Sequence, residues 1–155
     1  MLDSVTFGPQ VPNLSLGRLG ASGAWTLVPP SPNATNTAQS LGNPRNLKLN
    51  EWLAASTPPT TIDFLELYNP DSLPVALGGL YLSREPLGAP DQHRVADLSF
   101  IPAGGYVAFL ADGETALGPD HLGFGLPAEQ GSLGLFDGDL TLIDAIVYGP
   151  QRPDI

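Results

Sequence analysis

The sequence of 155 residues contains no cysteine, which excludes disulfides, thiolate zinc sites and cysteine nucleophiles. Basic residues are scarce, because six lysines and arginines stand against sixteen aspartates and glutamates, and Lys48 is the single lysine. The formal net charge of −10 repels nucleic-acid phosphates and anionic lipid surfaces. The composition therefore argues against nucleic-acid binding. It leaves solubility, or attraction of cations and basic partners, as the role of the acidity.

Long apolar runs are also absent. No continuous apolar stretch approaches the roughly 18 residues that a membrane-spanning helix needs, so we expect no membrane insertion. Residues 1–4 lack the basic and apolar regions of a signal peptide, and we expect none in this chain. Export would then depend on a signal elsewhere in a parent protein.

Glycine and proline are abundant instead, with 18 and 17 copies, while 42% of the chain is hydrophobic. Many turns between short strands explain both figures. From residue 46 onward no segment sustains a helical period, and the pattern predicts an all-β antiparallel sandwich. The Asp137-Gly138 pair predicts a hairpin with a type I′ turn. The predicted strands cover residues 47–53, 61–68, 75–77, 80–83, 98–101, 106–110, 132–136 and 140–148.

An internal repeat links the two ends of the chain. Residues 3–12 (DSVTFGPQVP) and 144–153 (DAIVYGPQRP) share an aspartate, a Gly-Pro-Gln run and a final proline. Most of the other positions differ by apolar or small exchanges. The repeat predicts a tandem array in which residues 1–28 are the C-terminal segment of a preceding unit. Residues 29–45, rich in proline, asparagine and threonine, are predicted to be a linker, and residues 46–155 the domain proper.

Six short motifs inside that domain occur in the order seen in one family. They are LNEWLA at 49–54, FLELYNP at 64–70, LGGLYLS at 77–83, IPAGGY at 101–106, GSLGL at 131–135 and DAIVY at 144–148. Over about residues 46–150 the chain resembles the bacterial type of lamin tail domain, and residues 1–28 resemble the end of a preceding copy. The resemblance implies an immunoglobulin-like β-sandwich in an exported or cell-surface multidomain bacterial protein. An intermediate-filament role does not transfer, because the chain has no heptads.

No pattern of catalytic residues is found. His93 and His121 do not have the spacing of a His-Glu-x-x-His motif, and the serines lack a Gly-x-Ser-x-Gly elbow. We predict that the chain is not an enzyme and holds no cofactor. His93 is expected in a loop, and both histidines are expected to be surface or turn residues.

Carboxylates are the best candidates for a metal site. Asp112, Glu114 and Asp120 flank one stretch, and Asp137 and Asp139 form another cluster. Calcium prefers six to eight oxygens, which sandwich loops often supply, but neither cluster has EF-hand spacing. Turn chemistry is the favoured interpretation, because Asp-Gly pairs suit tight turns.

Aromatic residues offer a second kind of binding site. They could line a carbohydrate-binding face, although packing within the sandwich is favoured for aromatics on strands. These residues are Trp25, Trp52, Tyr68, Tyr81, Tyr106 and Tyr148.

Two functions follow from these observations. The first is a non-catalytic structural or interaction module, with protein partners or copies of itself engaged by strand addition. The alternative is a carbohydrate- or calcium-binding module that targets a secreted enzyme, such as a nuclease. The duplicated strand suggests a further hypothesis. A monomer can seat only one of the two copies in the same slot of its sheet, so the N-terminal copy either hangs free or adds to a free sheet edge, its own or a neighbour's.

Overall fold

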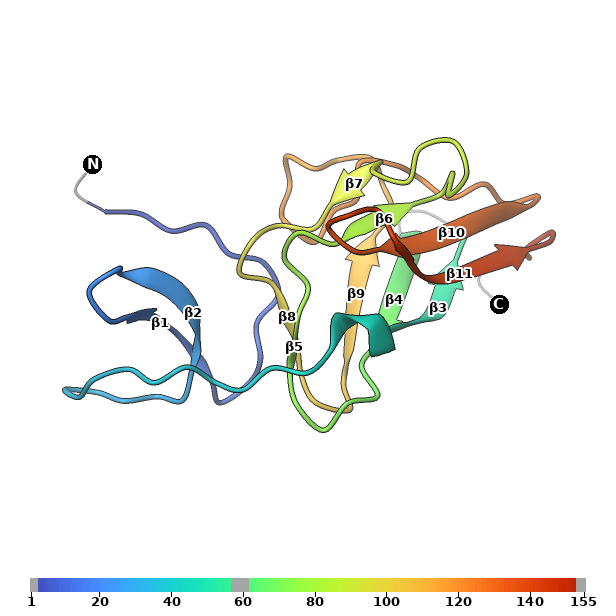
Figure 1. Ribbon diagram of the computed structural model, residues 1–155. Helices are drawn as coiled ribbons and strands as arrows, with labels where there is room; N and C mark the ends of the chain where they lie inside the picture. The colour runs from blue at the N-terminus through green and yellow to red at the C-terminus, as the bar shows by residue number, and fades with distance from the viewer. Residues whose placement is uncertain (1–2, 57–61, 153–155) are drawn as a thin grey trace.

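The computed structural model (Figure 1) describes residues 3–56 and 62–152. The described part is all-β, as predicted, with a single turn of 3-10 helix at Pro44–Asn46. None of its helices is long and apolar enough to cross a membrane. The strands are β1 (Ser15–Leu19), β2 (Ala24–Val28), β3 (Lys48–Leu53), β4 (Phe64–Tyr68), β5 (Val75–Ala76), β6 (Tyr81–Ser83), β7 (His93–Arg94), β8 (Phe100–Ile101), β9 (Tyr106–Leu110), β10 (Gly131–Phe136) and β11 (Leu142–Tyr148).

The strands form two larger sheets and two ribbons. One sheet has the order β11-β10-β6-β7 and the other β3-β4-β9, and every pairing in them is antiparallel. The ribbons are β5-β8 and β1-β2. This arrangement is consistent with the predicted β-sandwich. The ribbon β1-β2 lies to one side of it (Figure 1).

Alternating apolar side chains hold the larger sheets together. In β4, Leu65 and Leu67 are fully buried on either side of the less buried Glu66. Leu133 and Leu135 of β10 and Phe109 of β9 enter the same core. Because successive side chains of a strand point to opposite faces, this alternation puts one face of each sheet against the other.

The edges of the two sheets are joined by β3 and β11. The rings of Trp52 and Tyr148 lie 5.6 Å apart. The backbone N–H of Leu49 donates to Oδ2 of Asp144 at 3.0 Å. The Tyr148 hydroxyl donates to the carbonyl of Pro127 at 3.1 Å, and its ring lies where a Cβ at Gly131 would stand. β11 is therefore fixed by its side chains as well as by its ladder.

Two local predictions are wrong. His93 does not lie in a loop, because it pairs with Leu82 as part of β7. The β10–β11 hairpin forms, but its turn is not type I′ at Asp137-Gly138. The positive φ falls at Leu140, at 61°, and Oδ1 of Asp137 accepts from the N–H groups of Asp139 and Thr141. The Asp137 carboxylate therefore closes a loop of residues 137–141, longer than a two-residue turn.

A few predicted positions lie outside the described residues. They are residues 1–2 of the predicted preceding unit, residue 61 of the predicted strand 61–68, and residues 153–155 of the predicted domain.

Leu140 offers a test of this loop. A left-handed conformation costs leucine about 1 kcal/mol or more, and asparagine tolerates it better. Since the Leu140 side chain is 40% exposed, Leu140→Asn should raise the free energy of unfolding by about 0.5–1 kcal/mol in urea titrations. The matched change Leu142→Asn, at an exposed position inside β11, should give no gain. Equal effects at the two positions would contradict the loop geometry.

Candidate interaction surface

The segment that precedes β3 is docked onto the sandwich. We call residues 3–42 the arm. The N–H of Phe100 in β8 donates to the carbonyl of Pro9 at 2.8 Å. The side-chain amide of Gln10 donates to the carbonyl of Leu98 at 2.6 Å. Gly8 lies so close to the Ser99 hydroxyl that a Cβ would collide with it. The start of the arm therefore follows β8 without forming a regular strand.

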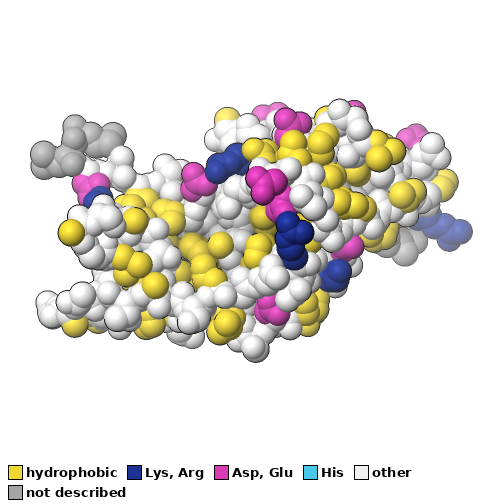
Figure 2. All heavy atoms as spheres, in the orientation of Figure 1, with side chains coloured by type: hydrophobic (Ala, Val, Ile, Leu, Met, Phe, Trp, Pro, Cys, Tyr) yellow, Lys and Arg dark blue, Asp and Glu magenta, His cyan; other side chains and the backbone are white. Residues whose placement is uncertain are grey.

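The rest of the arm adds a small second core. Val11, Leu27 and Phe100 are buried together, and Leu14 and Leu98 are among the apolar side chains around them. On the face shown in Figure 2, apolar side chains gather where the arm meets the sandwich. The hairpin β1-β2 is thus a folded part of the molecule, packed on the β5-β8 ribbon.

Residues of the predicted linker are hydrogen-bonded along their length. The N–H of Gln39 donates to the carbonyl of Leu27, and the N–H of Gly42 to that of Pro74, each at 2.9 Å. Asn43 then donates its N–H to Oδ2 of Asp71 at 2.9 Å. Although its composition is typical of a linker, this segment is hydrogen-bonded to β2 and to the loop between β4 and β5.

The two copies of the repeat share their turn and differ in their surroundings. The side-chain amide of Gln10 donates to the carbonyl of Gly8 at 2.9 Å, and that of Gln151 donates to the carbonyl of Gly149 at the same distance. The preceding residues form β11 in one copy and no strand in the other. The Gly-Pro-Gln turn is therefore one structural unit used twice.

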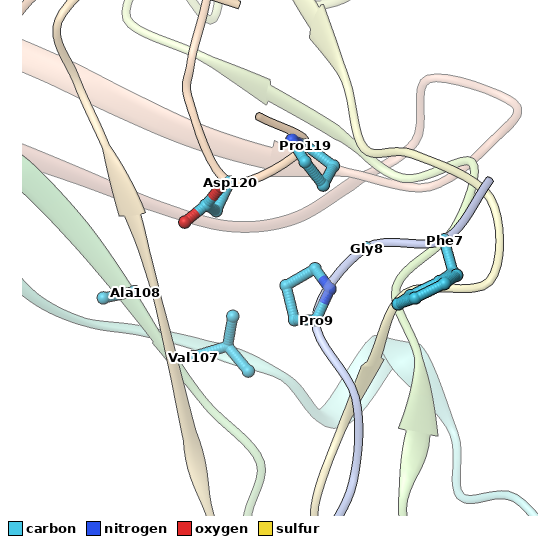
Figure 3. A pocket seen from close by; sticks show the side chains of 7 residues that line it. All are labelled: Phe7, Gly8, Pro9, Val107, Ala108, Pro119 and Asp120. Carbon is cyan, nitrogen blue, oxygen red and sulfur yellow. The ribbon is translucent and has the colours of Figure 1, made fainter. Parts of the chain in front are cut away.

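A groove of about 490 Å³ separates the arm from the edge strand β9 (Figure 3). Phe7 and Pro9 line one side, and Val107 and Ala108 the other, with Asp120 at one end. The N–H of Leu110 donates to the backbone carbonyl of Asp120, on the side of β9 away from β4. Because backbone groups alternate along a strand, Ala108 presents its N–H and C=O to the same side, facing the groove. An edge of this kind can accept another strand.

A second exposed surface covers the outer face of β11. Leu87 is fully exposed at 103%, Val147 is 85% exposed and Leu142 is 53% exposed. Pro86 and Ala145 lie beside them around a hollow of about 240 Å³. Contiguous apolar surface of this kind is typical of a contact region.

The predicted calcium ligands do not come together in one place. Asp112 accepts from the N–H of Glu114, and its Oδ2 lies 2.7 Å from Nδ1 of His121. Asp137 closes its own loop and pairs with Arg45 at 2.7 Å. Glu114, Asp120 and Asp139 are exposed. Within residues 3–56 and 62–152, no three acidic or histidine side chains gather as metal ligands would.

The environment of Asp112 changes its acidity. Partial burial raises the pKa of its carboxyl, but the N–H of Glu114 and the His121 ring outweigh that effect and hold the pKa below its usual range. The charged carboxylate of Asp112 therefore stabilises a turn and contacts His121.

The predicted carbohydrate-binding aromatics are dispersed. Trp25 lies beneath the Arg18 guanidinium, 4.8 Å from it, in the hairpin. Trp52 packs against Tyr148 between the sheets. The rings of Tyr68, at the end of β4, and Tyr106, at the start of β9, stack with their centroids 4.8 Å apart. Tyr81 lies in β6, half-buried. These residues do not form one face.

Comparison with known proteins adds no assignment: no protein-family model, curated protein or solved structure matches this chain.

His93 gives a pH test of the loop between β9 and β10. Its Nδ1 accepts from the N–H of Gly123 at 3.2 Å, and burial lowers the pKa of the ring below its ordinary 6.5. The unfolded chain therefore takes up this proton more readily than the folded one. The contribution of His93 to stability is present above pH 6.5 and is lost as the pH falls below that value.

Urea midpoints of the wild type and of His93→Gln, measured from pH 7.5 to 5, should diverge accordingly. Glutamine keeps an acceptor but does not titrate, so the variant should lose less stability on acidification. Parallel curves for the two proteins would show that the imidazole is not held neutral.

Proposed function

We propose that this chain is a non-catalytic structural and interaction module, one of a tandem series in a longer exported or cell-surface bacterial protein. The proposal includes an immunoglobulin-like, lamin-tail-like domain. The observation that carries it is the docked arm, whose first residues repeat the end of β11 and contact β8 through Pro9 and Gln10. The export and the bacterial source rest on the family resemblance alone.

The docking supports a structural role because it joins sequence that belongs to the end of one unit to the body of the next. The hydrogen bonds of Pro9, Gln10 and Gly42 attach both ends of the arm to the sandwich. The second core fixes its middle. A chain attached at three places transmits orientation between units, which a flexible tether does not.

The residues with catalytic potential have structural partners. His121 contacts Asp112, and His93 accepts from the backbone of Gly123. The first pair closes the loop after β9 on itself, and the second ties that loop to β7. This use of the histidines favours a module without its own chemistry.

The interaction half of the proposal rests on the groove beside β9. Pro9 and Ala108 line it from opposite sides, and Tyr106 at the start of β9 is 53% exposed. An extended segment laid along β9 would meet the backbone of Ala108 and the Tyr106 ring. The ligand class is therefore a protein segment in extended form.

Gly8→Ala tests the docking against a matched control. The new Cβ would meet the hydroxyl of Ser99, which is held by its bond to the carbonyl of Ala96 at 2.6 Å. Overpacking of this kind costs about 1–3 kcal/mol, so the arm should loosen and trypsin should cut faster after Arg18. Gly149→Ala changes the equivalent glycine, where no atom lies within 4 Å of the added Cβ. It should leave the melting temperature and the rate of trypsin cleavage as in the wild type.

If the two alanine variants melt and are cleaved alike, the arm is not docked through Gly8 and the proposed function loses its main support.

Calcium and glycans test the alternative, a ligand-binding targeting module. A ligand that binds only the folded state raises the melting temperature by mass action. We expect no shift of the melting temperature with millimolar calcium or with common glycans, since the candidate carboxylates are dispersed among turns and ion pairs. A saturable rise, abolished by Asp112→Asn or Asp137→Asn, would favour the alternative.

A further inference from the structure

β11 has a fixed pattern of inward and outward side chains. Ile146 packs on the main core and Tyr148 is buried. Asp144, also half-buried, accepts from the backbone of β3. Ala145 and Val147 are exposed on the outer face. In residues 144–148 an acidic, an aliphatic and an aromatic side chain point inward, and the two side chains between them point outward.

Residues 3–7 carry the same pattern. When the two Gly-Pro-Gln turns are superposed in sequence, Asp3, Val5 and Phe7 take the inward positions, and Ser4 and Thr6 the outward ones. In this chain the inward positions are uncovered, because Val5 is 36% exposed and Phe7 50% exposed, whereas Tyr148 is 5% exposed. Residues 3–7 thus have the side-chain pattern of a core strand, but no core covers them in this chain.

The matching slot in this chain is already filled. β11 pairs with β10 from Gly131↔Tyr148 to Phe136↔Leu142. The short loop of residues 137–141 joins the two strands, so their pairing has a small loop-closure cost and outcompetes a distant segment. A free edge equivalent to that of β10 is therefore found only in another copy of the module.

We propose that residues 3–7 form the last strand of a preceding copy of this module, with Val5 and Phe7 completing its core. This inference rests on the proposed tandem function and names the partner surface: the open edge of that copy's strand equivalent to β10. Asp3 takes the place of Asp144 and accepts from the backbone of the copy's first strand. Its present ion pair with Arg18, at 2.7 Å, joins side chains 63% and 44% exposed. A solvent-screened pair of this kind is weak enough to give way.

The consequence is a direct connection between units. Phe7 lies in the core of one sandwich, while the next residue, Gly8, is already in contact with Ser99 of the following one. No free tether separates the two bodies. The array is therefore a series of sandwiches with fixed relative orientation.

A hybrid chain tests the proposal. Residues 46–143 are placed directly before Asp3 of the full chain, so that residues 3–7 stand where β11 follows residue 143. The front half should fold into a second sandwich, seen as a second set of slowly exchanging amides. In this hybrid, Phe7→Ser should lower the melting temperature of the front half by more than about 10 °C. The outward control Thr6→Ser should shift it by less than about 2 °C, and so should Phe7→Ser in the single chain.

A second variant keeps the full chain unchanged in length. The changes Ala145→Ser, Ile146→Val, Val147→Thr and Tyr148→Phe place the sequence of residues 3–7 in the β11 slot. This graft should fold with a cooperative melt. A control graft that shifts the same residues by one position, and so exchanges the inward and outward faces, should unfold.

A graft that fails to fold, a front half that stays unfolded in the hybrid, or a hybrid insensitive to Phe7→Ser overturns the inference. The proposed function has a separate readout. If Gly8→Ala still loosens the arm while the hybrid fails, only the strand assignment is lost.

Discussion

One two-residue strand carries both hydrophobic cores of this molecule. In β8, Ile101 is fully buried in the main core, and its neighbour Phe100, 4% exposed, belongs to the second core under the arm. Adjacent residues of a strand face opposite ways, so the sandwich and the arm are packed on the two faces of the same backbone. The N–H of Phe100 adds the bond to Pro9. Loosening either core removes support from the other.

This arrangement makes the arm an integral part of the fold. Its contacts come from residues far apart in sequence, such as Gln10 and Leu98, which are separated by 88 positions. Long-range contacts of this kind are lost together when the sandwich unfolds. The proposed function follows from the same point, because an arm packed on β8 would fix the orientation of a preceding unit relative to the sandwich.

The sequence was informative where side chains repeat with a clear period. The short apolar runs in 106–110 and 132–136, each bounded by turn residues, led directly to β9 and β10, and the series of such runs predicted the all-β fold. It was uninformative where one specific contact decides the local structure. β7 is two residues long and forms where His93 and Arg94 pair with Leu82 and Tyr81 of β6. The β10–β11 turn depends on the Asp137 carboxylate, which moves the positive φ to Leu140.

Only part of the candidate interaction surface could be predicted from the sequence. The repeat of Gly-Pro-Gln could be predicted from the sequence, but the hydrogen bond from Gln10 to the carbonyl of Leu98 could not.

Amide hydrogen exchange of the wild-type chain tests most directly whether the arm and sandwich form one cooperative body. The N–H of Phe100, bonded to Pro9, and that of Gln39, bonded to Leu27, should exchange as slowly as core amides of β4. Exchange of these two amides by rapid local opening, while β4 stays protected, would contradict the account.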